Sequence, residues 1–465
     1  MQTVLTRMRN KSFAPIADRE YAPRDIRICD ETAFICFVGS YPPIMCGIAD
    51  YTKFIANKSP ISKWGMISFD LKKYGNPLTS ERLETGPVWY GIPGRHSLSA
   101  SEIMRGLNEI GSIEENFVLW FQHENGIWPD DDRFVTMLRE LDVPKVVTFH
   151  TIHFQSPETR TGMRWNQYDL LKKLLPCVEA ITVFSNGAYR AVTSAFPQYI
   201  DKVYIMKHGI HSYPEVSRMS RKEAKERLND YLLYESSLDL ETKKALYKQN
   251  IFFDPDTIIL GQTGFLAHAK GTELLYIARN KLQKLVPHRR IVAVRIGNPR
   301  DESQKIYSER LLQCLNDRDE FLLIVPPRHD TLPLSQRAFD VNFYWPNDCT
   351  QSGIMAHALG AGAVVAARDM EGVGETLKEA GQVVDTDLDR LLLKTRNLIL
   401  NPELGERLEE TVSKYAFEYS WEQQAQRHYQ LVERITPRAP IWSAAYSPLT
   451  NETVPITAAA ESGKE

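Results

Sequence analysis

Short apolar runs alternate with longer amphipathic stretches along most of the chain. The run Ala33–Val38 has the length of a strand buried on both faces, and a helical pattern over Ile48–Asn57 follows after a short loop. Strand, loop and helix in this order are typical of the start of a doubly wound α/β domain. The alternation predicts further strands at Met66–Phe69, Phe117–His123, Val146–His150, Ala180–Ser185 and Lys202–Met206. It predicts helices at Asp132–Leu141 and Gln167–Leu175.

The pattern changes over residues 214–250, which are rich in charge and contain no strand pattern. We interpret this segment as a helical linker or insert between two domains. The alternation then restarts. Strands are predicted at Thr257–Gly261, Arg290–Gly297, Phe321–Val325, Val341–Trp345 and Ala363–Ala367. Helices are predicted at Gly271–Leu285, Ser303–Asn316, Gly353–Leu359, Pro402–Phe417 and Glu422–Ile435.

The predicted fold class is therefore α/β, with two Rossmann-like doubly wound parallel-sheet domains that face each other across a cleft. The predicted segments are a flexible lead (1–30), an N-terminal domain (31–213), the linker or insert (214–250), a C-terminal domain (251–418), a last helix (419–436) and a disordered tail (437–465). Ligands bind beyond the carboxyl ends of the strands in such sheets, so the loops at these ends carry the candidate chemistry.

Composition excludes several classes of protein. The 465 residues include 56 basic and 59 acidic ones, and a net charge of −3 argues against a nucleic-acid footprint or a basic membrane-binding face. The six cysteines form no C-x-x-C pair, which favours free thiols in a reducing compartment. The sequence has no apolar run of 18 residues and no apolar region in its polar lead, so we predict a cytoplasmic location without a transmembrane helix.

Three loops at strand ends could contact a ligand. His150 ends a strand and would point into the cleft, although a structural histidine bonded to a neighbouring loop fits the same pattern. In the loop that ends another strand, Gly209 after His208 would allow a ligand to approach the backbone. Residues 348–362 form a polar loop that leads into a helix and could present backbone N–H groups to a phosphate; the alternative is a plain crossover without a ligand.

Lys270 stands directly before a predicted helix, where the helix dipole disfavours a cation. A phosphate facing Lys270 would compensate this cost, whereas a solvated surface lysine is the simpler alternative. The run Asp130–Asp132 could hold Mg²⁺ or Mn²⁺ against a diphosphate, but acidic residues are also expected at a helix start. We favour the helix cap and predict no metal site.

Seven stretches in this order and at these intervals resemble the GT-B glycosyltransferases of the large retaining family 4. The resemblance covers about residues 33–435. The stretches are Tyr41–Thr52, Gln122–Ile127, Val146–Thr151, Lys202–Ile210, Gly264–Gly271, Gln351–Gly362 and Ser420–Ala425.

The resemblance implies the GT-B fold, with the acceptor on the N-terminal domain, the nucleotide sugar on the C-terminal domain, and a last helix that crosses back. It implies that His150 contacts the transferred sugar and that Lys270 holds the donor diphosphate in place of a metal ion, without a cofactor. Gly47 would lie near the donor phosphate or the acceptor. The other implied donor-binding residues are His208, Gly209, Gly264, His268, Gly271, Gln351, Ser352, Gly353 and His357.

The chain departs from the family pattern at three points. The family carries two glutamates eight residues apart, and the positions here are Cys349, or Thr350 with a one-residue shift, and His357. The arginine expected before the lysine is also missing. The residues that could substitute for it are Arg295, Arg328 and His268.

From these observations we predict a retaining transferase that moves a hexose from a nucleoside diphosphate sugar to a hydroxyl acceptor. The partners are then the donor and the acceptor, with no nucleic acid, peripheral membrane contact left open, and a monomer or homodimer in solution. A non-catalytic member that binds a nucleotide, a sugar or a partner protein is the alternative, and a phosphorylase is a third. The sequence leaves the donor base, the sugar and the acceptor open.

Overall fold

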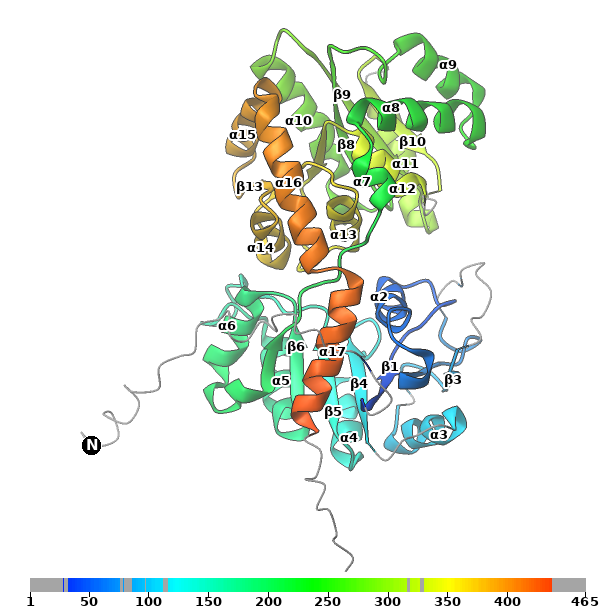
Figure 1. The fold of residues 1–465 in the computed structure, drawn as a ribbon, viewed down its shortest axis with the longest axis vertical. Helices are drawn as coiled ribbons and strands as arrows, with labels where there is room; N and C mark the ends of the chain where they lie inside the picture. Colours follow the sequence, from blue (N-terminus) through cyan, green and yellow to red (C-terminus); the bar gives the residue numbers. More distant parts are fainter. Residues whose placement is uncertain are drawn as a thin grey trace, which may run out of the picture.

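The structure is a computed structural model, and it describes residues 28, 32–75, 78, 86–96, 98–111, 116–315, 318–326 and 330–436. The predicted lead (apart from residue 28), the predicted tail and Arg328 lie outside these residues. Two α/β domains are stacked along the long axis of the molecule (Figure 1). The predicted fold class is confirmed: both domains are built on parallel sheets covered by helices.

The N-terminal domain has a seven-stranded sheet in the order β3-β2-β1-β4-β5-β6-β7. Its strands are β1 (Phe34–Val38), β2 (Trp64–Phe69), β3 (Val88–Ile92), β4 (Phe117–His123), β5 (Lys145–Phe149), β6 (Ala180–Val183) and β7 (Val203–Ile205). Its helices are α2 (Gly47–Ala56), α3 (Ala100–Ile110), α4 (Asp131–Glu140), α5 (Trp165–Leu174) and α6 (Asn186–Ala195).

The C-terminal domain has a six-stranded sheet in the order β10-β9-β8-β11-β12-β13. Its strands are β8 (Thr257–Thr263), β9 (Arg290–Gly297), β10 (Glu320–Ile324), β11 (Val341–Tyr344), β12 (Val365–Arg368) and β13 (Val383–Asp385). The helices of the second half are α7 (Pro214–Arg218), α8 (Arg221–Asp230), α9 (Leu240–Gln249), α10 (Thr272–Leu285), α11 (Glu302–Cys314), α12 (Thr331–Ala338), α13 (Gly353–Gly360), α14 (Glu371–Glu379), α15 (Leu388–Leu400), α16 (Pro402–Glu418) and α17 (Trp421–Ile435).

The order of strands reverses at one place in each sheet. β1 pairs with β2 on one side and with β4 on the other, and β8 pairs with β9 and β11 in the same way. Loops that leave the two central strands at such a switch point diverge and open a crevice. The loops after β1 and β4 in one domain, and after β8 and β11 in the other, are therefore the places where a ligand would bind.

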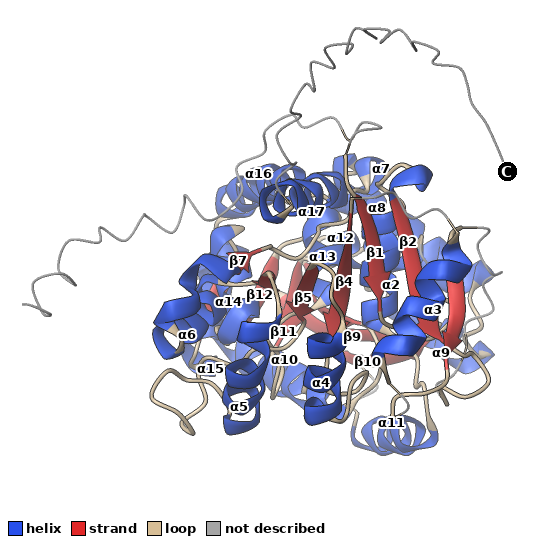
Figure 2. Cartoon of the chain, turned by 90° about the horizontal axis from the view of Figure 1, so that it is seen from below, coloured by secondary structure: helices blue, strands red, loops and turns tan. Residues whose placement is uncertain are grey.

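The two faces of the N-terminal sheet are covered by different helices. Alternate residues of β1 and β4, such as Phe37 and Trp120, pack against α2 and α17. The intervening residues, such as Cys36 and Leu119, pack against α3, α4 and α5 (Figure 2). Each strand is thus buried on both faces, which explains why its sequence is a continuous apolar run.

Residues 214–250 form helices α7, α8 and α9, and apolar residues of α8 and α9 pack against the second sheet. Leu228 of α8 and Leu246 of α9 share one apolar cluster with Ile259 of β8 and Val292 of β9. The segment is helical, as the sequence predicts, but it contributes to the core of the C-terminal domain. The domain boundaries themselves stay predictions.

The chain crosses between the domains twice, and the two crossings touch. The backbone N–H of Ile210 donates to the carbonyl oxygen of Tyr419 at 2.8 Å, and Ile210 forms a parallel bridge with Ser420. After the second crossing, α17 lies against the N-terminal sheet (Figure 1). Helix α17 therefore belongs to the N-terminal domain in space, although it ends the described chain.

Candidate active site between the two domains

The first wall of the cleft is the loop after β1, which ends at helix α2. Gly47 is the first residue of α2 and is exposed. A Cβ atom at Gly47 would meet nothing within 4 Å, and no side chain caps the helix at Cys46. This helix start therefore opens onto free space, as expected of a backbone that a ligand can approach.

His150 lies at the carboxyl end of β5 and is partly buried. Its Nε2 atom is 2.7 Å from the side-chain oxygen of Gln122, and the ring of Tyr51 meets it edge-on at 4.9 Å. Burial, with smaller contributions from His208 and His123, holds the pKa of His150 well below the usual value. The imidazole is therefore neutral, and because the Gln122 oxygen fixes the proton on Nε2, Nδ1 is left as an acceptor.

The second wall includes the loop after β8, which ends at Lys270 and Gly271. Lys270 is half-buried, and its ammonium lies 5.9 Å from the centre of the Tyr344 ring. Gly271 has a φ of +62°, and a Cβ atom there would lie 2.3 Å from the carbonyl oxygen of Trp345. Only glycine fits this corner, which fixes the loop against the end of β11.

Arg295 supports the Gly264–Gly271 loop from behind and is not available to a phosphate. It is fully buried, and Nε donates to the hydroxyl of Thr272. The four terminal N–H groups donate to the carbonyl oxygens of residues 262, 264, 265 and 296 at 2.6–3.3 Å. All five guanidinium donors are thus used, so the suggestion that Arg295 replaces the missing arginine is wrong. Burial lowers the pKa of Arg295 to about 10.

The other possible replacement, His268, lies on the surface. Its side chain is 78% exposed and its Nε2 atom lies 4.0 Å from a carboxylate oxygen of Glu273. Gly264, by contrast, lies in the bend of the loop, with a φ of +115° and its carbonyl oxygen bonded to Arg295. Of these basic residues, Lys270 is therefore the one that lies half-buried beside Tyr344 at the end of β11.

Helix α13 contributes a second helix start to the same wall. Ser352 is its N-cap but accepts no hydrogen bond from the helix, and Gly353 is exposed with nothing within 4 Å of a Cβ position. The N–H groups of the first turn therefore have no side-chain cap. Gln351 precedes this turn and is half-buried.

His357 points away from this helix start. Its ring stacks on His211 with centres 3.8 Å apart, and its Nδ1 atom is 2.5 Å from the hydroxyl of Tyr213. His211 and Tyr213 belong to the first crossing between the domains. The predicted donor-binding position therefore contacts the interdomain connection in this structure.

His208 and Gly209 are also engaged by the protein itself. Nδ1 of His208 is 2.8 Å from the carbonyl oxygen of Gly209, and burial lowers the pKa of His208 to about 4. A Cβ atom at Gly209 would lie 2.2 Å from the Trp421 ring. From the sequence, we expect a ligand to approach Gly209 closely. In the structure, the Trp421 ring occupies that place.

The two predicted catalytic residues border one short segment. The hydroxyl of Thr350 reaches the carbonyl oxygen of His150 across the domain boundary at 3.5 Å. Burial raises the pKa of the neighbouring Cys349 thiol, and the charge of Lys270 lowers it. His150 and Lys270 therefore come from different domains, and both lie near the segment Cys349–Thr350.

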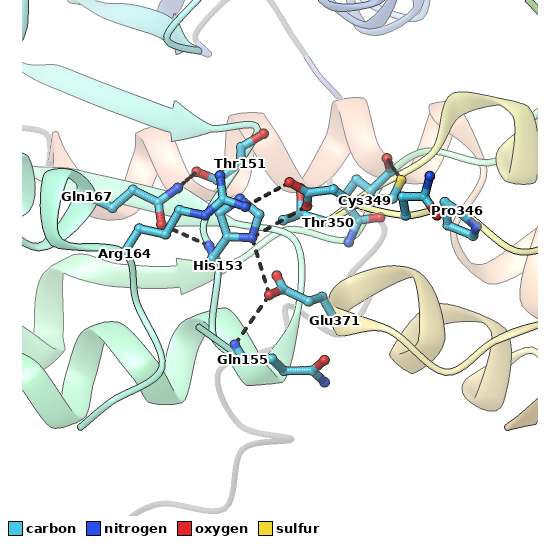
Figure 3. Close-up of polar contacts among 12 residues, drawn as sticks. Thr151, His153, Gln155, Arg164, Gln167, Pro346, Cys349, Thr350 and Glu371 are labelled. Carbon is cyan, nitrogen blue, oxygen red and sulfur yellow. Dashed lines mark hydrogen bonds and ion pairs between the residues drawn. The ribbon is translucent and has the colours of Figure 1, made fainter. Parts of the chain in front are cut away.

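A polar network across the same gap was not found from the sequence. Nδ1 of His153 is 3.2 Å from Glu371 Oε1 and 4.0 Å from Asp348, whose other carboxylate oxygen accepts from Arg164 at 2.7 Å (Figure 3). His153 follows β5, and Glu371 follows β12. The strand-end rule that selects His150 applies equally to both, so the signal was present in the sequence.

A second set of bridges holds α6 against α14. The carboxylate of Glu375 accepts from the backbone N–H groups of Asn186 and Gly187, at 2.5 and 2.9 Å. The buried ammonium of Lys207 donates to Glu379 at 2.8 Å. A cavity of about 650 Å³ opens between the domains beside these bridges, lined by residues of both domains, among them Gln155 and Glu371.

The acidic run before α4 acts as a helix cap, as predicted. The carboxylate of Asp130 accepts from the backbone N–H of Arg133 at 3.0 Å, and Asp132 pairs with Lys173 at 2.9 Å. Among the described residues, no group of three or more His, Cys, Asp and Glu side chains is placed to hold a metal ion.

Comparisons with known proteins find the fold but not a family. The UDP-forming α,α-trehalose-phosphate synthase of Burkholderia xenovorans is 14% identical and superposes with a TM-score of 0.59 over 87% of this chain and 99% of its own. An Escherichia coli trehalose-6-phosphate structure bound with UDP-2-fluoro glucose has a TM-score of 0.60 at 11% identity, covering 87% of this chain and 100% of its own.

Anabaena Alr3699/HepE, solved with UDP and glucose, has a TM-score of 0.56 at 13% identity, covering 86% of this chain and 99% of its own. No family model matches the sequence, and no curated protein is found similar to it. At these identities the likeness shows the two-domain GT-B architecture. None of the described helices combines the length and the apolar character needed to cross a bilayer.

Proposed function

We propose that the protein is a retaining glycosyltransferase that moves a hexose from a nucleoside diphosphate sugar to a hydroxyl acceptor. One observation carries the proposal. Lys270 and the uncapped start of α13 belong to the C-terminal domain, and the neutral His150 of the N-terminal domain contacts Thr350, which precedes α13. A cation and free N–H groups on one side, with an uncharged imidazole on the other, suit a diphosphate joined to a sugar.

In this proposal each group has a role in the reaction, either in stabilising the charge that develops or in orienting the sugar. The bond from the anomeric carbon to the diphosphate breaks, and negative charge develops on the departing phosphate oxygen. Lys270 and the first N–H groups of α13 stabilise that charge, so no metal ion or cofactor is required. The acceptor oxygen bonds to the same face of that carbon and its proton passes to the departing phosphate. His150, held by Gln122, orients the sugar.

The structural neighbours suggest which donor to test first. Two of the three structures named above were solved with UDP or a UDP sugar, and we extend that preference to this chain as part of the proposal. Membership of the retaining family 4 and a cytoplasmic location belong to the same proposal. The acceptor class, a glycan, a polysaccharide precursor or a small metabolite, is left to the assay.

The test is a panel of nucleotide sugars read by release of nucleoside diphosphate. We expect one donor to be turned over, and Lys270→Ala and His150→Ala to abolish the release. Lys281→Ala, on the exposed face of α10 where Lys281 pairs with Asp389, should keep wild-type activity. Thermal stabilisation by a nucleotide without turnover of any donor would contradict the proposal. That result would favour the non-catalytic alternative, which the two missing glutamates motivate, at Cys349 or Thr350 and at His357.

A further inference from the structure

Glu371 adopts a backbone conformation that side chains rarely take. Its φ is +44°, and among the described residues the only other non-glycine with a positive φ is Asn250. Asn250 ends helix α9, where asparagine tolerates the left-handed conformation. A glutamate has no such local reason to be there. Strain of this kind persists only where the surrounding structure maintains it, and it concentrates at ligand sites.

The carboxylate of Glu371 is buried and only half satisfied. The residue is 8% exposed. Its Oε1 atom accepts from Nδ1 of His153 at 3.2 Å and from the backbone N–H of Gln155 at 3.3 Å (Figure 3). Its Oε2 atom is buried without a hydrogen-bond partner among the described residues. A buried carboxylate oxygen left without a donor is costly, so a ligand that supplies a donor would be favoured.

The position of Glu371 is fixed beside the loop that leads into α13. A Cβ atom on the next residue, Gly372, would lie 2.5 Å from Nε2 of Gln351 and 2.6 Å from the carbonyl oxygen of Thr350. Only glycine allows this contact, and it holds the corner at Glu371 against the segment Cys349–Thr350. The same corner lines the 650 Å³ cavity between the domains. Glu371 therefore borders both this cavity and the segment Cys349–Thr350.

Around Cys349, one positive side chain and two negative side chains act in opposite directions. The Cys349 thiol feels the positive charge of Lys270, and the negative charges of Asp348 and Glu371 act on it in the opposite direction. A diphosphate would be drawn to Lys270 and repelled by Glu371. The part of a donor that suits Glu371 is neutral and rich in hydroxyl groups, which is the sugar.

We propose that Glu371 is a sugar-contacting residue of the donor site, with Oε2 accepting a hydrogen bond from a hydroxyl of the transferred hexose. The assignment rests on the proposed function. It gives the strained backbone a role, because the left-handed turn at Glu371 brings its carboxylate to the Thr350 corner. His153 and the N–H of Gln155 position the carboxylate by binding its other oxygen.

The test compares binding of the nucleotide sugar with binding of the free nucleoside diphosphate, both measured by calorimetry. In Glu371→Gln we expect affinity for the nucleotide sugar to fall about tenfold or more, the usual effect of losing a hydrogen bond to a charged group. Affinity for the free diphosphate should stay within about twofold, because that ligand has no sugar. A KM that rises for the donor but not for the acceptor would agree.

Glu371→Gly separates the sugar contact from the strain. It should lose the same affinity for the nucleotide sugar, and because glycine takes a positive φ freely, the relief of backbone strain should offset part of the stability lost with the hydrogen bonds to His153 and Gln155. Asn250→Gly is the matched control: it changes the other positive-φ residue and should leave both affinities as in the wild type.

Three outcomes would overturn the assignment. Equal losses for both ligands in Glu371→Gln would show that the residue only holds the domains together through His153. Unchanged affinity for both would show that it touches neither. If the wild type binds the free diphosphate but no nucleotide sugar, or binds no nucleotide at all, the proposed function falls and this assignment falls with it.

Discussion

Lys270 lowers the stability of the protein at a position where it would favour the binding of an anionic ligand. It precedes the first turn of α10, where the helix dipole disfavours a positive charge by about 0.3–1 kcal/mol. Its nearest aromatic partner, the ring of Tyr344, is 5.9 Å away and compensates little of this. The lysine is therefore better explained by what it binds than by what it stabilises.

Lys270→Gln should raise the free energy of unfolding slightly, by up to ~1 kcal/mol, and lower kcat/KM for the donor by roughly tenfold to a hundredfold. Urea unfolding and the diphosphate-release assay measure the two quantities on the same protein. Lys281→Gln, on the same helix, should leave kcat/KM unchanged. A Lys270→Gln protein that is less stable and fully active would contradict the role given to this residue.

Buried histidines should make the protein sensitive to acid. Burial lowers the pKa of His208 and of His428 to about 4 and that of His123 to about 3. An unfolded histidine titrates near ~6.5, so between about pH 6.5 and pH 4 the unfolded chain binds protons that the folded chain does not. The contribution of these histidines to stability is thus fully present above about pH 6.5 and is lost as the pH is lowered through this window.

The effect can be assigned to one residue with His428→Phe. His428 lies in α17 with its ring 4.4 Å from that of Trp120, a site that a phenyl ring fills. The free energy of unfolding falls between pH 7 and pH 5, and this fall should be roughly 1–3 kcal/mol smaller in the variant than in the wild type. Denaturant titrations at the two pH values measure the difference. The exposed His288→Asn serves as the control and should keep the wild-type pH dependence. An identical pH dependence in His428→Phe would contradict the assignment.

Some site residues could be predicted and others could not, for a definite reason. His150 and Lys270 follow strands, and a residue after a parallel strand lies at the ligand edge of the sheet whatever its side chain does. The direction of a side chain within an element is not fixed in this way. Arg295 turns under a loop and His357 turns toward the crossing, and only the packed structure shows either.

At the scale of elements, the contact between Trp421 and Gly209 fixes where α17 begins. The indole ring fills the place of a Cβ atom at Gly209, and its Nε1 is 3.3 Å from His211. Gly209→Ala should therefore destabilise the protein by about 1–3 kcal/mol, because the added methyl displaces a ring that is buried against Tyr51.

The matched control is Gly405→Ala in helix α16. A Cβ atom there would meet only a side-chain carbon 4.0 Å away, so alanine should stabilise the helix by about 0.5–1 kcal/mol. Denaturant unfolding of the two variants under one set of conditions measures both changes. A Gly209→Ala protein as stable as the wild type would show that α17 can shift without cost.

Both strands missed from the sequence lie at an edge of a sheet. Helices α3, α6, α12, α14 and α15 were not named either. β3 and β13 end the two sheets, and neither is predicted. β3 is largely half-buried and β13 has three residues, so neither shows the long apolar run that marks a central strand. The helices of 214–250 were predicted as a linker or insert because their charged faces conceal the few apolar residues, such as Leu228, that reach the core.

At the scale of the whole molecule, the domains are held together by bridges of unequal strength. Lys207 is 3% exposed and faces two carboxylates, whereas Arg164 and Asp348 are 42% and 58% exposed. Removing a buried charge leaves its partners unpaired, while an exposed pair contributes about 0–1 kcal/mol. The two-domain arrangement follows from the alternation of elements along the chain. These bridges do not, since each joins residues that are far apart in the sequence.

Lys207→Ala should lower the free energy of unfolding by about 2 kcal/mol or more and should increase the radius of gyration measured by X-ray scattering. The first effect follows because Glu375 and Glu379 lose their buried cation, and the second because the ion pairs that join the two domains at Lys207 are lost. Arg164→Ala should change the free energy of unfolding by less than about 1 kcal/mol. An equal effect of the two substitutions would show that burial of Lys207 does not matter.

The hydrogen bond between Ile210 and Tyr419 has a mechanical consequence. Because the two crossings are hydrogen-bonded to each other, we expect the domains to move relative to each other mainly by rotation about this connection. A disulfide engineered between Ile210→Cys and Ser420→Cys, which form a backbone bridge, should leave that rotation possible. A bifunctional thiol crosslinker between Arg164→Cys and Asp348→Cys, which come from different domains, should prevent it.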